Sequence, residues 1–282
     1  MSAERIDVMK TYKLYINGAF PRSESGRVYE VKDAKGKFLA NPSLASRKDL
    51  RDAVTAARAA QTSWAGATAY LRGQILYRIA EIMEGRTDQF VKEIVAMEGV
   101  TPKAALTQVQ EAIDTWVWYA GWTDKLSALA GSTNPVAGPF YNFTTPEAIG
   151  VVGVFADSKP SLLGLVNAVA PVIASGNTAV VVASEKYPLS AITLSEALAT
   201  SDLPAGVLNI LTGKASELSS WAASHIDIDA LDASGLSKKE LTEAQTLGAD
   251  NLKRIHTFGA TKSPQRILAF MEAKTVWHPI GI

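Results

Sequence analysis

The chain has 282 residues, of which 47% are hydrophobic and 20% are charged, a composition typical of an ordinary globular protein. Its 28 basic and 28 acidic residues leave no net charge, which argues against a nucleic-acid partner because binding to phosphates needs a basic surface. The absence of cysteine excludes disulfides, thiolate metal ligands and cysteine nucleophiles together.

The longest apolar run, residues 162–174, is interrupted by Gly164, Asn167 and Pro171 and is too short to span a bilayer. The first residues carry no apolar stretch of the signal-peptide kind. We therefore expect a soluble, cytoplasmic protein without a membrane partner.

The N-terminal half is predicted to be mainly helical after an opening hairpin. Residues 12–31 alternate like two strands, with Asn17-Gly18 as the turn. Ser46 followed by Asp49 is typical of a helix start, and apolar residues then recur at helical spacing. The expected helices cover residues 46–64, 71–85, 90–95 and 103–129.

The last of these helices carries an aromatic cluster of Trp116, Trp118, Tyr119 and Trp122. Such a cluster can stack on a ligand or pack in a core or an interface. The helical spacing of the four rings favours packing.

Residues 131–146 are rich in Gly, Pro, Ser and Asn and mark a boundary. Beyond them strands alternate with helices, a pattern that implies right-handed crossovers and a parallel sheet. The fold class is therefore α/β, with a Rossmann-like doubly wound sheet that follows an N-terminal helical region. The expected strands are 149–155, 178–183, 207–211, 230–231 and 252–258, and the expected helices are 162–174, 189–200, 215–224 and 238–247.

Several segments resemble the aldehyde dehydrogenase superfamily in their order and spacing, and together they cover nearly the whole chain. They are LYINGAF from Leu14, AARAAQTSW, GVVGVF from Gly150, APVIASGNTAVVV from Ala170, PLSA…LPAGVLNILTG from Pro188 to Gly213, LKRIHTFGATKSP from Leu252 and KTVWHPIG from Lys274. The chain is most similar to the shortened, inactive dehydrogenase-like domain at the C-terminus of family 16 aldehyde dehydrogenases and of long proline utilization A proteins.

This resemblance implies a division into three parts and the absence of the catalytic domain. Residues 1–130 would pack their hairpin and helices on a degenerate Rossmann-like domain at 147–262. Residues 131–150 and 271–282 would form a protruding β-flap that acts as an oligomerisation arm.

The residues that match the family's catalytic positions differ here. The nucleophilic Cys has no counterpart, the general-base Glu is matched by Phe258, and the oxyanion-binding Asn is matched by Lys159. A phenyl ring cannot accept a proton, and without a nucleophile there is no oxyanion for Lys159 to stabilise. A Ser158-Lys159 nucleophile is disfavoured because adjacent side chains rarely converge on one atom. We expect no catalytic residues.

The family's cofactor contacts are also largely missing. The Lys that binds the adenosine ribose is matched by Val182. The Gly that lets the cofactor come close to the next crossover is matched by Ala233. Glu185 persists, either as a vestigial ribose contact or, more simply, as an acid favoured at a helix start. We expect no cofactor.

His225, Asp227, Asp229 and Asp232 raise the question of a metal site. Because residues alternate across a strand, Asp227 and Asp229 would share one polar strand edge, and we expect no metal. His256 and His278 stand alone and are interpreted as structural or surface residues.

The flap carries the functional prediction. Residues 140–155 and 274–277 would form a small projecting sheet, whose apolar surface and strand edges need a cover. The expected interface residues are Phe143, Ile149, Val151, Thr275, Val276 and Trp277.

The expected partner is an active aldehyde dehydrogenase subunit, which this chain would stabilise while covering its substrate channel, or else a second copy of the chain. Two alternatives stay open. One is a nucleotide-binding sensor or weak oxidoreductase that uses the crevice remaining at the carboxyl ends of the strands. The other is a homo-oligomeric scaffold.

Overall fold

A parallel β-sheet forms the centre of the protein in the computed structural model, which describes residues 8–281. The strand order is β7-β6-β5-β8-β9, and every neighbouring pair is parallel. This arrangement confirms the predicted fold class, and the strands fall where sequence predicts them. They are β5 (Val151–Phe155), β6 (Thr178–Val182), β7 (Leu208–Leu211), β8 (Ala230–Asp232) and β9 (Arg254–His256).

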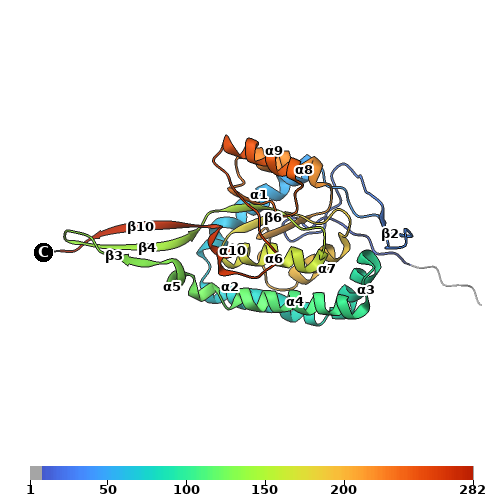
Figure 1. Cartoon of the computed structure of the whole chain (residues 1–282), viewed down its shortest axis with the longest axis horizontal. Helices are drawn as coiled ribbons and strands as arrows, with labels where there is room; N and C mark the ends of the chain where they lie inside the picture. The colour runs from blue at the N-terminus through green and yellow to red at the C-terminus, as the bar shows by residue number, and fades with distance from the viewer. Residues whose placement is uncertain (1–7, 282) are drawn as a thin grey trace, which may run out of the picture.

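Helices cover both faces of this sheet (Figure 1). One face carries α1 (Arg47–Gly66), α8 (Ala215–Ser224) and α9 (Lys238–Ala249), and the other carries α6 (Ser161–Ala174) and α7 (Leu189–Leu198). An outer layer beyond α6 and α7 holds α2 (Ala69–Glu84), α3 (Thr87–Glu98) and α4 (Pro102–Ala120). No helix among residues 8–281 is long and apolar enough to cross a membrane.

The alternation of side chains along the strands divides the apolar interior in two. Val152 and Val154 of β5 face the core beneath α6, α7 and α4, whereas Val151 and Phe155 face the core beneath α1 and α8. Strand β6 repeats this division. Because both faces of the sheet are buried, these strands are continuous apolar runs in the sequence.

The helix starts follow from local capping. Ser46 caps α1 in a capping box with Asp49, as the sequence predicts, and Ser237 does the same for α9 with Glu240. Thr101 caps α4, whose first residue is Pro102.

The hairpin predicted over residues 12–31 is wrong beyond its turn. Asn17 and Gly18 have positive φ angles, and Ile16 and Ala19 exchange backbone hydrogen bonds across them. The self-pairing ends with the hydrogen bond from the Leu14 N–H to the Pro21 carbonyl, and Tyr15 also pairs with Ile210, so this segment joins β7 at the edge of the central sheet. The short strands β1 (Val31–Lys32) and β2 (Phe38–Ala40) pair with each other.

The helix predicted over residues 103–129 breaks in the structure. It ends at Ala120, Gly121 forms the C-cap, and a 3-10 turn η1 (Thr123–Lys125) and α5 (Leu126–Ala130) follow. Trp116 and Tyr119 are fully buried, and Trp118 and Trp122 pack against them at the edge of the core. The aromatic cluster is therefore part of the core.

An antiparallel arm projects from the body and ends near the C-terminus (Figure 1). It consists of β3 (Ser132–Asn134), β4 (Phe140–Ala148) and β10 (Met271–Pro279), in the order β10-β4-β3, and is called the flap below. The short helix α10 (Pro264–Leu268) leads back to its base.

The predicted flap extends too far into the body. Gly150, with φ +135°, separates β4 from β5, and β5 belongs to the central sheet. Val151 is completely buried there, so its assignment to the interface is wrong. Ile149 packs against the core at the base of the flap.

Asn177 fastens the flap to the sheet. Its fully buried amide donates to the carbonyl of Phe270 at 2.7 Å and accepts the backbone N–H of Gly150 at 2.8 Å.

Asn177→Ala leaves Gly150 without an acceptor, so we expect a loss of about 2 kcal/mol in the free energy of unfolding. Urea denaturation measures it, with the exposed Asn41→Ala as control. Equal midpoints for the two variants would contradict this role.

Candidate functional site

A crevice lies beyond the carboxyl ends of β5 and β6, where open α/β sheets usually bind ligands. Its volume is about 820 Å³, and Phe155, Ala156, Val182 and Ala183 form its floor. The segment around β1 and the N-terminal ends of α8 and α9 form its walls.

The crevice carries more negative than positive charge. Four carboxylates line it against two ammonium groups, which leaves a net charge of −2: Glu30, Asp33, Glu185 and Glu240 against Lys32 and Lys186. Lys32 is already paired with Glu30 at 3.3 Å. The uncompensated charge in the crevice is therefore acidic.

Tyr29 enters this crevice from the N-terminal segment. Its hydroxyl is buried and has no hydrogen-bond partner among residues 8–281. Burial, together with the nearby carboxylate of Glu185, raises the pKa of the Tyr29 hydroxyl far above its ordinary value. The phenol is therefore neutral and leaves the net charge of the crevice unchanged.

Of the positions matched to the family's cofactor contacts, Val182 and Glu185 line this crevice, whereas Ala233 is not one of its lining residues. Val182 and Ala233 are both buried, and neither offers a polar atom from its side chain. Glu185 is exposed at the rim.

The positions matched to catalytic groups do not converge. Lys159 donates from Nζ to the backbone carbonyl of Glu98 at 3.2 Å and lies near the Tyr187 ring. Phe258 stacks on His256 and meets Phe270 edge-on, with ring centroids 5.8 Å apart in both pairs. These side chains take part in packing and in a backbone contact.

A buried ion pair next to Phe258 was not predicted. Asp232 ends β8 and is fully buried, and Arg266 of α10 reaches it at 3.3 Å between Nη2 and Oδ2. The guanidinium also lies 4.7 Å from the Phe258 ring centroid. Burial raises the pKa of Asp232, while Ser234 and Arg266 act against this shift.

The residues considered as metal ligands lie apart. Asp229 pairs with Arg58 at 2.7 Å, Asp232 pairs with Arg266, and His225 accepts the backbone N–H of Asp227. Within residues 8–281, no three His, Cys, Asp or Glu side chains gather as ligands of a metal ion would.

The flap is the second candidate site. Strand β10 pairs with β4 on one side only, and among residues 8–281 no strand covers its other edge, where Arg254 reaches the backbone only at the Met271 carbonyl. Trp277 is 59% exposed and meets Phe140 at 5.7 Å between ring centroids, and Tyr141 lies 5.4 Å from Phe143 on the opposite face. The strand edge and the aromatic side chains together suit a protein partner.

Charged residues of β10 lie only near the base of the flap, and they are neutralised. Glu272 pairs with Arg254 at 2.7 Å and Lys274 pairs with Glu147 at 3.1 Å. From Thr275 to Pro279 the strand has no acidic, Lys or Arg residue. The outer half of the edge therefore lacks the charges that usually prevent strand pairing.

The predicted interface residues of the flap take different positions. Thr275 is exposed and shares a hydrogen bond with Thr144 at 2.9 Å between hydroxyl oxygens, whereas Val276 and the opposite Phe143 are half-buried. Trp277 is the most exposed of the predicted hydrophobic interface side chains.

A scan against protein-family models matches residues 20–277 to the Aldehyde dehydrogenase family. Human retinal dehydrogenase 2 is 34% identical over 267 residues, which cover 93% of this chain and 51% of that protein. Cytosolic 10-formyltetrahydrofolate dehydrogenase of Xenopus tropicalis is 32% identical over 90% of this chain and 29% of its own length. The aldehyde dehydrogenase of Bacillus cereus, solved as its NAD⁺ complex, superposes with a TM-score of 0.82 at 26% identity, over 88% of this chain and 50% of that one. The chain thus spans about half the length, or less, of these relatives.

Proposed function

The chain belongs to the aldehyde dehydrogenase family, and on that premise we propose that it is a non-catalytic subunit that binds an active aldehyde dehydrogenase through its flap. The observation that carries this proposal is the free edge of β10 together with the exposed Trp277. An edge of this length on a projecting arm is stable in solution when another chain covers it.

The residues at the positions matched to the family's catalytic groups support a non-catalytic role. The chain offers no thiol for nucleophilic attack, and Phe258 stands in an aromatic cluster where a base would be needed. Lys159 is held by the carbonyl of Glu98, outside the crevice. The chain therefore offers neither the thiol nucleophile nor, at Phe258, the carboxylate base of the family's reaction.

The crevice does not fit the dinucleotide that the Bacillus cereus relative binds. A pyrophosphate is anionic, and the crevice has a net charge of −2. Val182, which lines the crevice, supplies no ribose-binding cation. The residues present therefore disfavour the cofactor through charge and through the missing ribose contact.

In the proposed complex the flap extends a sheet of the partner by one strand. The backbone of β10 supplies the hydrogen bonds, and Trp277 and Phe140 supply apolar contact on one face. The chain would then cover the partner's substrate channel and fix the geometry of the assembly.

A second candidate function, a nucleotide sensor, is favoured only by the survival of the crevice, with its volume of about 820 Å³. We expect isothermal titration calorimetry of the pure chain with NAD⁺, NADP⁺ and ADP to detect no binding tighter than about 100 µM, which corresponds to about −5.5 kcal/mol. Saturable binding above that affinity would replace the non-catalytic proposal with the sensor.

The proposed function is tested by purifying the tagged chain from its native cells and measuring mass by light scattering. We expect a complex in which a second, longer dehydrogenase chain oxidises aldehydes, and no such activity from this chain expressed alone. A species of twice 30.1 kDa without another protein would instead indicate a homo-oligomeric scaffold. Aldehyde oxidation by the isolated chain would overturn the proposal.

A further inference from the structure

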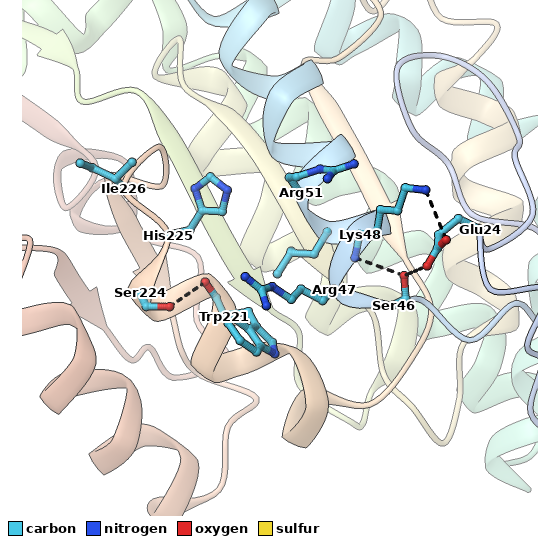
Figure 2. Close-up of a pocket in the computed structure, with 10 residues that line it drawn as sticks. Glu24, Ser46, Arg47, Lys48, Arg51, Trp221, Ser224, His225 and Ile226 are labelled. Carbon is cyan, nitrogen blue, oxygen red and sulfur yellow. Dashed lines mark hydrogen bonds and ion pairs between the residues drawn. The ribbon is translucent and has the colours of Figure 1, made fainter.

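A second cavity, of about 640 Å³, lies between the start of α1 and the end of α8. It shares no lining residue with the crevice described above. Figure 2 shows Arg47, Trp221, His225 and Ile226 around it. Its volume lies in the range of small-molecule sites.

Arg47 is the distinctive group of this cavity. Its guanidinium carbon lies 3.5 Å from the centroid of the Trp221 ring, so the cation is held against the face of the indole (Figure 2). Stacking leaves the N–H groups at the edge of the guanidinium free to donate. Among residues 8–281, the Arg47 side chain has neither a hydrogen-bond acceptor nor an ionic partner, and its contact is the stacking on Trp221.

The other cations of the cavity are neutralised. Lys48 pairs with Glu24 at 3.4 Å, and Arg51 pairs with Asp52 at 2.8 Å. At the start of α1, the backbone N–H groups of Lys48 and Asp49 already donate to the hydroxyl of Ser46. Among the basic side chains that line this cavity, Arg47 is therefore the one positioned to bind an anion.

The remaining walls offer one more donor and an apolar surface. His225 accepts the Asp227 N–H at its Nδ1, so its neutral ring carries the proton on Nε2 and can donate from there. Ile226 is 80% exposed and Trp221 is 41% exposed, which is unusual for large apolar side chains that line a cavity.

We propose that this cavity binds a small organic anion whose carboxylate or phosphate accepts from Arg47 and His225. The apolar part of the ligand lies against Trp221 and Ile226. A guanidinium fork suits both kinds of anion, because each presents paired oxygens. This site does not depend on the proposed function, and its failure would leave the flap proposal intact.

Calorimetry of the whole chain with phenyl phosphate, benzoate, inorganic phosphate and benzyl alcohol tests the site. We expect at least one of the two aromatic anions to bind with a dissociation constant below about 1 mM. Benzyl alcohol lacks the charge and inorganic phosphate lacks the ring, so each should bind at least about ten-fold more weakly. The ratio of phenyl phosphate to benzoate affinity identifies the preferred anion.

Arg47→Met should weaken binding of the preferred anion at least about ten-fold, while Arg47→Lys keeps the charge but not the fork and should fall between. Arg47 is exposed, so neither variant should alter the melting temperature. The control is Arg22→Met, an exposed arginine away from the cavity. No saturable binding of either aromatic anion up to about 10 mM, or wild-type affinity in Arg47→Met, would overturn the proposal.

Discussion

Trp277→Asp is expected to abolish the proposed complex between this chain and an active aldehyde dehydrogenase. Trp277 is the most exposed aromatic side chain of the flap, and a buried tryptophan at an interface commonly contributes about 2 kcal/mol or more to binding. The aspartate would also bring an unpaired charge into the covered surface. Together these effects correspond to an affinity loss of roughly 100-fold or more.

The measurement compares wild type and variant by sedimentation of the purified complex and by retention of aldehyde oxidation after affinity capture. Val276→Asp, at the neighbouring half-buried position opposite Phe143, should have the same effect. The matched control is Val8→Asp, which places the same charge at a residue that is 91% exposed. Trp277 makes few contacts in the free chain, so the variant should keep the wild-type circular dichroism and melting temperature.

Two results would decide against the flap as the docking element. One is a Trp277→Asp variant that still sediments with its partner at wild-type affinity. The other is an equal loss of binding in Val8→Asp, which would show that any added charge disturbs the complex.

The central sheet could be predicted because its sequence signals are local. The short run at residues 178–182 is rich in β-branched residues and follows a Gly-Asn turn, which favours a strand buried on both faces over a helix, and a helical segment follows it. The crevice at the carboxyl ends of the strands follows from that topology. Helix α1 begins where Ser46 and Asp49 place it, because a capping box acts within one turn.

The errors arose where one residue or a distant segment decides the structure. The boundary between flap and body depends on Gly150, whose positive φ turns the chain between two strands that only Ile149 and Gly150 separate in sequence. The opening strand pairs with β7 because Tyr15 finds a free edge there, about two hundred residues away in sequence. Local alternation cannot distinguish this pairing from a hairpin.

Local sequence patterns could not predict the charge of the crevice either. Glu30 and Asp33 come from the segment around β1 and are brought to the strand ends only by the fold. The same holds for Arg266, which reaches Asp232 because α10 packs against α6. The one signal in the sequence is that Asp232 follows a predicted apolar strand. A carboxylate buried there needs a cation from another segment.

Arg266→Met is expected to destabilise the folded chain by about 3 to 5 kcal/mol at pH 8, because it leaves the carboxylate of Asp232 buried without its cation. Methionine fills a similar volume and keeps contact with Phe258, so the effect reports the lost charge more than a cavity. Urea unfolding followed by tryptophan fluorescence measures the change. The exposed Arg22→Met is the control for loss of an arginine and should stay within about 0.5 kcal/mol of wild type.

The pH dependence distinguishes an electrostatic origin from lost packing. The pKa of Asp232 is raised in the folded state, so the folded chain holds its proton more tightly than the unfolded chain does, and stability falls as pH rises through the interval between the two pKa values. Arg266 lowers the pKa of Asp232 and of the neighbouring Asp157. Removing it raises the folded-state pKa values and so extends that interval to higher pH. The deficit of Arg266→Met relative to wild type should therefore be larger at pH 8 than at pH 5.

Adding Asp232→Asn should recover most of the loss, since the amide can still accept from Ser234 without a charge. A deficit that does not change with pH and persists in the double variant would mean that Arg266 acts through packing alone.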